Sequence, residues 1–291
     1  MIEAIGFAIL SAILFAYGTI FVRKGLEELN FFSASIVVTL IGFIIYLPLM
    51  ILLVPLNRIN MGGIVLFLLS GIFTPGLTRL FYFKGIEKLG AAINAPIFAT
   101  HPLFSAILAF ILLNEQPSYG IWLGIFCIIC GGIILEKVMH NNGGSKRFNK
   151  IDALFPLSAA IVLGFGYILR KTGLNMCNEP IAGATFSYMA SLLVYTLLFT
   201  LSSRMRSSAM VNGKALQRFW KAGVLFGIGW VSTFYALRVG DVTIVAPLVN
   251  TEPLFVILFI HLFLRKLERV SIALVIGALF IVIGTTFIIL Y

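Results

Sequence analysis

Ten long apolar runs follow one another along the chain, separated by short polar or charged breaks. Each run has the ~20 residues that one helix needs to cross the hydrocarbon core of a bilayer. The predicted spans are residues 3–22, 31–54, 62–83, 91–113, 118–136, 152–169, 180–202, 219–237, 242–264 and 271–290. We therefore expect an all-α integral membrane protein with ten transmembrane helices. The first run follows Met1 without a basic stretch, which favours a retained span over a cleaved signal.

Composition agrees with a bilayer as the solvent. The chain is 60% hydrophobic and 11% charged, whereas soluble domains carry about 25% charged residues. The formal net charge of +10 is typical of Lys and Arg in loops beside anionic lipid. We expect a multi-pass protein of the cell membrane whose partners are lipid and a small-molecule substrate, with no nucleic acid among them.

Short sequence elements recur in the same order in the two halves of the chain. Leu10-Ser11-Ala12 returns 147 residues later as Leu157-Ser158-Ala159, and Pro102-Leu103-Phe104 returns 151 residues later as Pro253-Leu254-Phe255. The small drift in spacing is what loop insertions produce. An ordered series of this kind indicates an internal duplication.

The duplication predicts three segments: a five-helix repeat at 1–139, a basic linker loop at 140–150 and a second five-helix repeat at 151–291. Because each repeat has an odd number of spans, the second enters the membrane from the opposite side. The predicted fold is two inverted five-helix repeats around a central cavity, an architecture that many secondary transporters use for alternating access.

One proline-containing stretch, present in both halves, resembles the EamA family of the drug/metabolite transporter superfamily. Its elements are Ala95-Pro96, Pro102-Leu103-Phe104 and Leu113-Asn114-Glu115 in the first half, and Ala246-Pro247, Glu252-Pro253-Leu254, Glu268 and Gly277 in the second. The resemblance covers essentially the whole chain. It implies a ten-helix carrier with a cavity between its halves, usually an exporter of amino acids or related metabolites.

Three functions compete for this architecture. The favoured one is a secondary transporter of small metabolites, amino acids or related compounds, exporting by alternating access and either facilitative or proton-coupled. The second is a lipid or lipid-linked sugar flippase, which needs a lateral opening. The third is an intramembrane enzyme, but the sequence has no HExxH motif and no paired acids. We expect no enzyme activity, no cofactor and no metal, and we interpret Cys127 and Cys130 as packing residues inside an apolar run.

Charged and titratable side chains inside the spans are few. With these limits, 20 of the 21 Lys and Arg fall in loops or at span ends, the exception being Arg79, and only Glu252 among the 11 acids lies near the middle of a span. Such charges cost roughly 2.5–3.5 kcal/mol each on insertion scales, so they mark a function or a specific partner.

Glu252 and His101 lie at matching positions, 151 residues apart, each directly before a proline. We expect both to line the central cavity, or to lie just behind it, and to be candidates for proton coupling. The alternatives are a structural Glu252 bonded to a neighbouring helix and a His101 that only forms a hydrogen bond inside the bundle. Arg79 either extends toward Lys84 and the membrane surface or anchors a carboxylate or phosphate of the substrate.

Further polar and aromatic side chains are candidates for the cavity wall, although such residues also serve ordinary helix packing. They are Tyr17, Tyr82, Asn94, Thr100, Trp230, Tyr235 and Asn250. The two asparagines are the better candidates, because a buried amide needs a hydrogen-bond partner.

Glycines at helical spacing, Gly120 and Gly124 in one span and Gly277 and Gly284 in the last, indicate close helix contact. That contact lies either within a monomer, which we favour, or between the subunits of a homodimer.

Orientation stays open at this point. The side of the N-terminus carries four basic residues, Arg58, Arg170, Lys171 and Arg238, against 16 on the other side, which places the termini outside. The family resemblance implies cytoplasmic termini.

Overall fold

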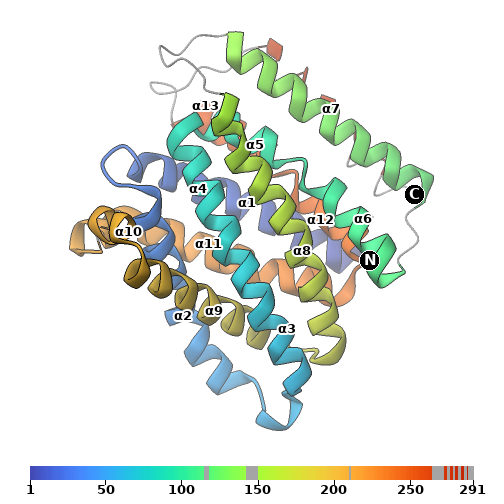
Figure 1. The fold of residues 1–291 in the computed structure, drawn as a ribbon. Coiled ribbons are helices and arrows are strands. Elements are labelled where there is room, and N and C mark those ends of the chain that lie inside the picture. The colour runs from blue at the N-terminus through green and yellow to red at the C-terminus, as the bar shows by residue number, and fades with distance from the viewer. Residues whose placement is uncertain are drawn as a thin grey trace.

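The computed structural model describes residues 1–114, 118–141, 150–209 and 211–263, together with residues 272, 273, 276, 277, 279, 280, 283, 284 and 287. Most of the predicted linker and much of the predicted tenth span therefore lie outside the described residues. Within them, the regular structure is helical (Figure 1). In chain order the elements are α1 (Ile2–Gly25), α2 (Phe31–Leu53), η1 (Leu56–Arg58), α3 (Met61–Gly71), η2 (Ile72–Leu77), α4 (Thr78–Leu89), α5 (Ala91–Phe98), α6 (His101–Leu113), α7 (Tyr119–Asn141), η3 (Lys150–Ala153), α8 (Leu154–Met176), α9 (Pro180–Leu201), α10 (Ser203–Ser208), α11 (Gly213–Val239), α12 (Val242–Val249) and α13 (Glu252–Phe263).

Seven helical stretches of the described chain are long and apolar enough to cross a membrane. They are Ile2–Gly25, Phe31–Leu53, Met61–Leu89, Ile151–Met176, Pro180–Leu201, Gly213–Val239 and Val242–Phe263. The predicted fourth span is divided between α5 and α6, and α6 is shorter than a bilayer is thick. The fold is thus an all-α membrane bundle, and the count of ten helices stays a prediction.

The bundle is held together by long helix pairs. Helix α1 packs along α11, α2 packs against both α11 and α9, and α8 contacts α3, α4 and α6. At the α1–α11 contact, the Ser11 hydroxyl donates to the Gly229 carbonyl at 2.8 Å and lies 2.7 Å from the hydroxyl of Thr233. Helix α7 runs along one edge of the bundle and packs against α5 (Figure 1).

One glycine of the last predicted span lies close to α7. A Cβ added at Gly284 would approach the Gly124 carbonyl oxygen to 2.5 Å and the Ile128 side chain to 2.8 Å. The missing side chain at Gly284 therefore lets the last predicted span approach α7 closely.

The predicted span 62–83 is not one continuous helix. At η2 the backbone of Thr74 leaves the helical region (φ −141°, ψ 121°), directly before Pro75. Proline lacks an N–H and clashes with the preceding turn, so carbonyls near it lose their helical partners. The Tyr195 hydroxyl of α9 donates to the carbonyls of Pro75 at 3.2 Å and Gly76 at 3.0 Å. A neighbouring helix therefore adds hydrogen bonds at the break, beside the Thr78 N–H that bonds the carbonyls of Phe73 and Pro75.

Two further breaks face each other. The chain leaves the helical pattern between α5 and α6 and again between α12 and α13, so the predicted spans 91–113 and 242–264 each consist of two helices. The Asn250 side chain at the second break donates to the Ala99 carbonyl at the first, at 2.7 Å. In each case a proline, Pro102 or Pro253, lies in the first turn of the following helix, where proline is favoured.

We predict that Gly71→Ala destabilises the protein by about 1–3 kcal/mol, because overpacking forces neighbouring groups to shift. A Cβ there would clash with the backbone of Ser187 in α9, and the Ser191 hydroxyl already donates to the Gly71 carbonyl at 2.8 Å. The measurement is the thermal unfolding midpoint of the purified protein in detergent. Gly6→Ala is the matched control, since a Cβ at Gly6 meets nothing within 4 Å. Equal midpoints for both variants would contradict the close α3–α9 approach.

Candidate functional site

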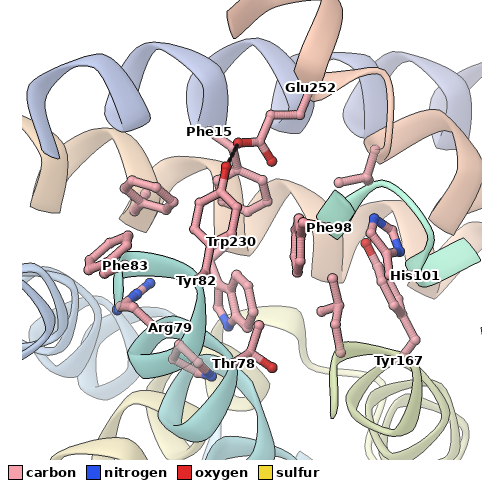
Figure 2. Close-up of a pocket in the computed structure, with 14 residues that line it drawn as sticks. Phe15, Thr78, Arg79, Tyr82, Phe83, Phe98, His101, Tyr167, Trp230 and Glu252 are labelled. Carbon is pink, nitrogen blue, oxygen red and sulfur yellow. Dashed lines mark hydrogen bonds between the residues drawn. The ribbon is translucent and has the colours of Figure 1, made fainter. Parts of the chain in front are cut away.

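A cavity lies where the broken helices meet α1, α8 and α11 (Figure 2). The side chains that line it are Phe15, Pro75, Thr78, Arg79, Tyr82, Phe83, Phe98, His101, Leu163, Tyr167, Phe226, Trp230, Val249 and Glu252. A mostly aromatic and aliphatic wall with a few polar groups is the usual composition of a small-molecule site.

Glu252 is the first residue of α13, and its carboxylate connects three helices. One oxygen, Oε1, accepts hydrogen bonds from the hydroxyl of Tyr82 in α4 at 2.8 Å and from that of Thr19 in α1 at 3.2 Å (Figure 2). The side chain is buried and also lines the cavity. The two readings of Glu252, cavity-lining and bonded to neighbouring helices, therefore describe the same carboxylate.

His101 is the first residue of α6 and lines the same cavity. Its ring stacks on Tyr167 of α8, with centroids 5.8 Å apart, and packs against Phe98 at 5.2 Å. Among the described residues its Nδ1 has no hydrogen-bond partner, although the side chain is only 2% exposed. The imidazole is thus held by aromatic rings and keeps one nitrogen available for a ligand.

Arg79 does not extend to the membrane surface. It is 4% exposed, and its guanidinium donates to the Thr39 hydroxyl at 2.6 Å and to the Tyr188 hydroxyl at 3.5 Å. Its Cζ also lies 5.4 Å and 5.5 Å from the ring centroids of Tyr188 and Phe226. These contacts direct the side chain into the bundle, so the interpretation in which it reaches toward Lys84 and the membrane surface is wrong.

The position of Arg170 after the predicted span 152–169 predicts that it lies in a loop, and this prediction is wrong. Helix α8 continues to Met176, and Arg170 is fully buried within it. Its Nη2 donates to the Thr74 hydroxyl at 2.5 Å, and its guanidinium lies 4.2 Å from the Trp230 ring centroid and 4.9 Å from that of Tyr167. A second cation therefore lies directly behind the cavity wall.

The adjacent Lys171 explains the error. A dibasic pair after an apolar run is typical of a span end. Here only Lys171 has contacts of that kind, because its ammonium group donates to the carbonyls of Leu237 and Gly240, at the end of α11, at 3.1 and 2.7 Å. The sequence did contain a later boundary signal. Pro180 favours the first turn of the next helix, which leaves a three-residue loop and allows α8 to reach Met176.

Tyr82 and Trp230 line the cavity as the sequence suggests. Tyr82 donates to Glu252, whereas the indole Nε1 of Trp230 is buried without a partner among the described residues. Both therefore contribute a polar atom to a largely aromatic wall.

Five other candidates are not part of the cavity wall: Tyr17, Asn94, Thr100, Tyr235 and Asn250. Each has a local reason. Tyr17 packs on Phe259, Tyr235 stacks on Phe7, and the Thr100 hydroxyl donates to the Ile97 carbonyl at 2.9 Å. Asn250 is used at the helix break, and Asn94 is buried against Gly85.

The remaining wall residues were not singled out by the sequence. Most are aromatic, such as Phe15, Phe83 and Phe226, in a chain with 27 phenylalanines. Residue type alone therefore could not identify them, since which ring faces the cavity depends on helix rotation and on the breaks. Thr78 differs from these aromatic residues because it is polar, and its buried hydroxyl has no hydrogen-bond partner in the described part of the chain. Across the same residues, no group of three His, Cys, Asp or Glu side chains could hold a metal ion.

We predict that Asn250→Ala costs about 1–3 kcal/mol of stability beyond Asn94→Ala, because it leaves the buried Ala99 carbonyl unpaired. The two substitutions remove the same side-chain volume from buried positions, but the described residues offer the Asn94 amide no partner. Thermal unfolding of both variants in detergent measures the difference. Equal midpoints would show that the contact between the two breaks contributes nothing.

Comparison with known proteins assigns the family. The model of the EamA-like transporter family matches the chain twice, over residues 2–136 and 150–290. The chain is similar to an uncharacterized transporter of Archaeoglobus fulgidus, 22% identical over 276 residues that cover 94% of this chain and 93% of the relative. It is also similar to an uncharacterized transporter of Clostridium kluyveri, 26% identical over 53% of this chain and 48% of the relative.

A crystal structure superposes on 97% of this chain and 96% of its own with a TM-score of 0.74 at 16% identity, which shows a shared fold alone. The family match covers both halves, and the described helices are apolar and long enough for several membrane crossings. The chain belongs to the EamA-like transporter family and is a multi-pass transporter of the cell membrane.

Proposed function

We propose that the protein is a secondary transporter that carries a small metabolite through the cavity by alternating access. The observation that carries this proposal is the cavity itself, where Arg79, His101 and Glu252 are sheltered from lipid and exposed to one shared space. Ionisable groups inside a membrane protein are expensive and typically mark a substrate or ion pathway. Amino acids or related compounds, moved in the export direction, are the substrates that the family resemblance favours.

The proposed transporter has ten helices in two inverted repeats, 1–139 and 151–291, joined by the linker 140–150. Equivalent helix pairs support this symmetry: α1 packs on α11, and α8 packs on α3 and α4. Equivalent caps do so too, because Asn60 and Asn212 each accept a backbone N–H at the start of α3 and α11. The two family matches divide the chain at the same place. We propose a monomer as the working unit.

Glu252 is the proposed proton-coupling group, with His101 as the second candidate. The carboxylate lines the cavity while accepting two hydrogen bonds from other helices. Gain or loss of its proton would change those bonds, so protonation and helix arrangement would be linked. A facilitative carrier would instead use Glu252 as a fixed structural acid.

We predict that Glu252→Gln abolishes substrate accumulation driven by a pH gradient but retains counterflow, because glutamine keeps an oxygen acceptor for Tyr82 and Thr19 and cannot release a proton. The measurement is transport of labelled amino acids and organic acids by proteoliposomes, with and without an imposed pH gradient. Asp152→Asn is the control, because it removes an acid that lies outside the cavity wall.

Wild-type gradient response in Glu252→Gln would contradict proton coupling through this residue and leave a facilitative carrier. Absence of counterflow for every labelled compound, with transbilayer movement of labelled lipid instead, would contradict the carrier and favour a flippase.

A further inference from the structure

The unpaired polar atoms around the cavity are mainly hydrogen-bond donors. Trp230 offers an indole N–H, which cannot accept, and Arg170 has two guanidinium nitrogens, Nε and Nη1, without partners among the described residues. The Thr78 hydroxyl, which lines the cavity, is also unpaired within that part of the chain. These side chains are at most 7% exposed, so water does not freely replace the missing acceptors.

The donors belong to one face of the cavity. Thr78 and Arg79 are consecutive in α4 and both line the wall, as does Trp230 of α11. The Arg170 guanidinium lies 4.2 Å from the Trp230 ring centroid and is bonded to Thr74, which lies at the helix break four residues before Thr78. We call Thr78, Arg79, Trp230 and Arg170 the donor face.

Glu252 lies at the other end of the same wall. It is bonded to Tyr82, which comes one helical turn after Thr78 in α4, a rise of about 5.4 Å. In Figure 2 the carboxylate and the Thr78 side chain lie at opposite ends of the Tyr82 ring. The hydrogen-bond partners of the carboxylate are Tyr82 and Thr19, both at Oε1, and among the described residues it forms no hydrogen bond with the donor face.

The charges at the site do not balance. Two guanidinium groups, Arg79 and Arg170, stand against the one carboxylate of Glu252. Both arginines contact hydroxyls and aromatic rings; within the described chain, neither forms an ion pair. A buried cation without a counter-charge is costly, and an anionic ligand removes that cost.

We propose that the donor face binds an oxyanion group, carboxylate or phosphate, and that the transported substrate is a small organic anion with an apolar body. This proposal rests on the carrier function proposed above. Within the amino acids and related compounds named there, it narrows the substrates to compounds that have no ammonium group. The oxygens accept from Arg79, Trp230 and Thr78, while Arg170 supplies charge from behind the wall. Phe15, Phe83 and Phe226 provide the rings against which the apolar body packs.

The test uses a matched series that shares one phenyl body. The full-length protein in lipid nanodiscs is titrated calorimetrically with 3-phenylpropanoate, 3-phenylpropanamide, phenylalanine, 2-phenylethylamine and 2-phenylethylphosphonate. We expect an oxyanion to bind on the order of 10-fold or more tighter than the neutral amide, because hydrogen bonds to charged groups are the stronger ones. The better of the carboxylate and the phosphonate identifies the anion class, and either supports the donor face.

Four variants locate the effect. Arg79→Gln and Arg170→Gln should each remove about 10-fold of the anion's advantage and leave amide binding unchanged. Trp230→Phe keeps an aromatic ring beside Arg170 and deletes one donor, so it should weaken anion binding roughly 3-fold and remains informative if an arginine variant does not fold. Arg238→Gln is the control, because it removes one exposed positive charge that lies outside the cavity wall.

The donor face is overturned if the amide, phenylalanine or 2-phenylethylamine binds the wild type as tightly as the anions. It is equally overturned if Arg79→Gln and Trp230→Phe keep the wild-type preference. Counterflow measured on the same compounds separates this result from the carrier proposal. Anion binding without counterflow supports the proposed oxyanion site and contradicts the proposed carrier function. Counterflow without a preference for anions supports the carrier function and contradicts the oxyanion site.

Discussion

Everything at the centre of this molecule depends on pairing backbone carbonyls where helices break inside the membrane. Hydrocarbon offers no hydrogen-bond partner to an exposed carbonyl. A broken helix therefore persists only where other protein groups donate hydrogen bonds to the carbonyls at the break. Tyr195 does so at η2, and Asn250 does so at the break before α6. Because these breaks are satisfied, α4, α6 and α13 can start inside the bundle and direct Arg79, His101 and Glu252 into one cavity.

The need to give buried polar groups a partner also explains the aromatic rings around the two buried arginines. Arg79 and Arg170 are too buried for water, and ring faces offer them a polarizable surface without adding a charge. Cation–π contacts hold the guanidinium groups in place while leaving N–H donors available for other acceptors. A carboxylate partner would have consumed those donors and neutralised the site.

Residues that conflict with their surroundings are the ones that a sequence reveals most readily. Glu252, His101 and Arg79 are ionisable within apolar runs, so hydropathy alone placed them inside the membrane, and the structure puts all three on one wall. Arg170 was missed because its neighbour Lys171 made a buried position look like a span end. Asn94 and Asn250 could not be distinguished, since pairing with Ala99 depends on two breaks meeting in space. The prolines indicated the breaks but not what the breaks would contact.

Five polar contacts at or beside the cavity share one further property. Tyr82 and Thr19 with Glu252, Arg79 with Tyr188, Thr74 with Arg170, and Ala99 with Asn250 each join a residue before 140 to a residue after 150. Any movement of one part of the chain against the other must therefore exchange these contacts. Under the proposed alternating-access function, a ligand that binds the same side chains would compete with some of those bonds and replace others, so it would bind the two arrangements with different affinity. That difference is the thermodynamic requirement for a substrate to drive its own carrier between states.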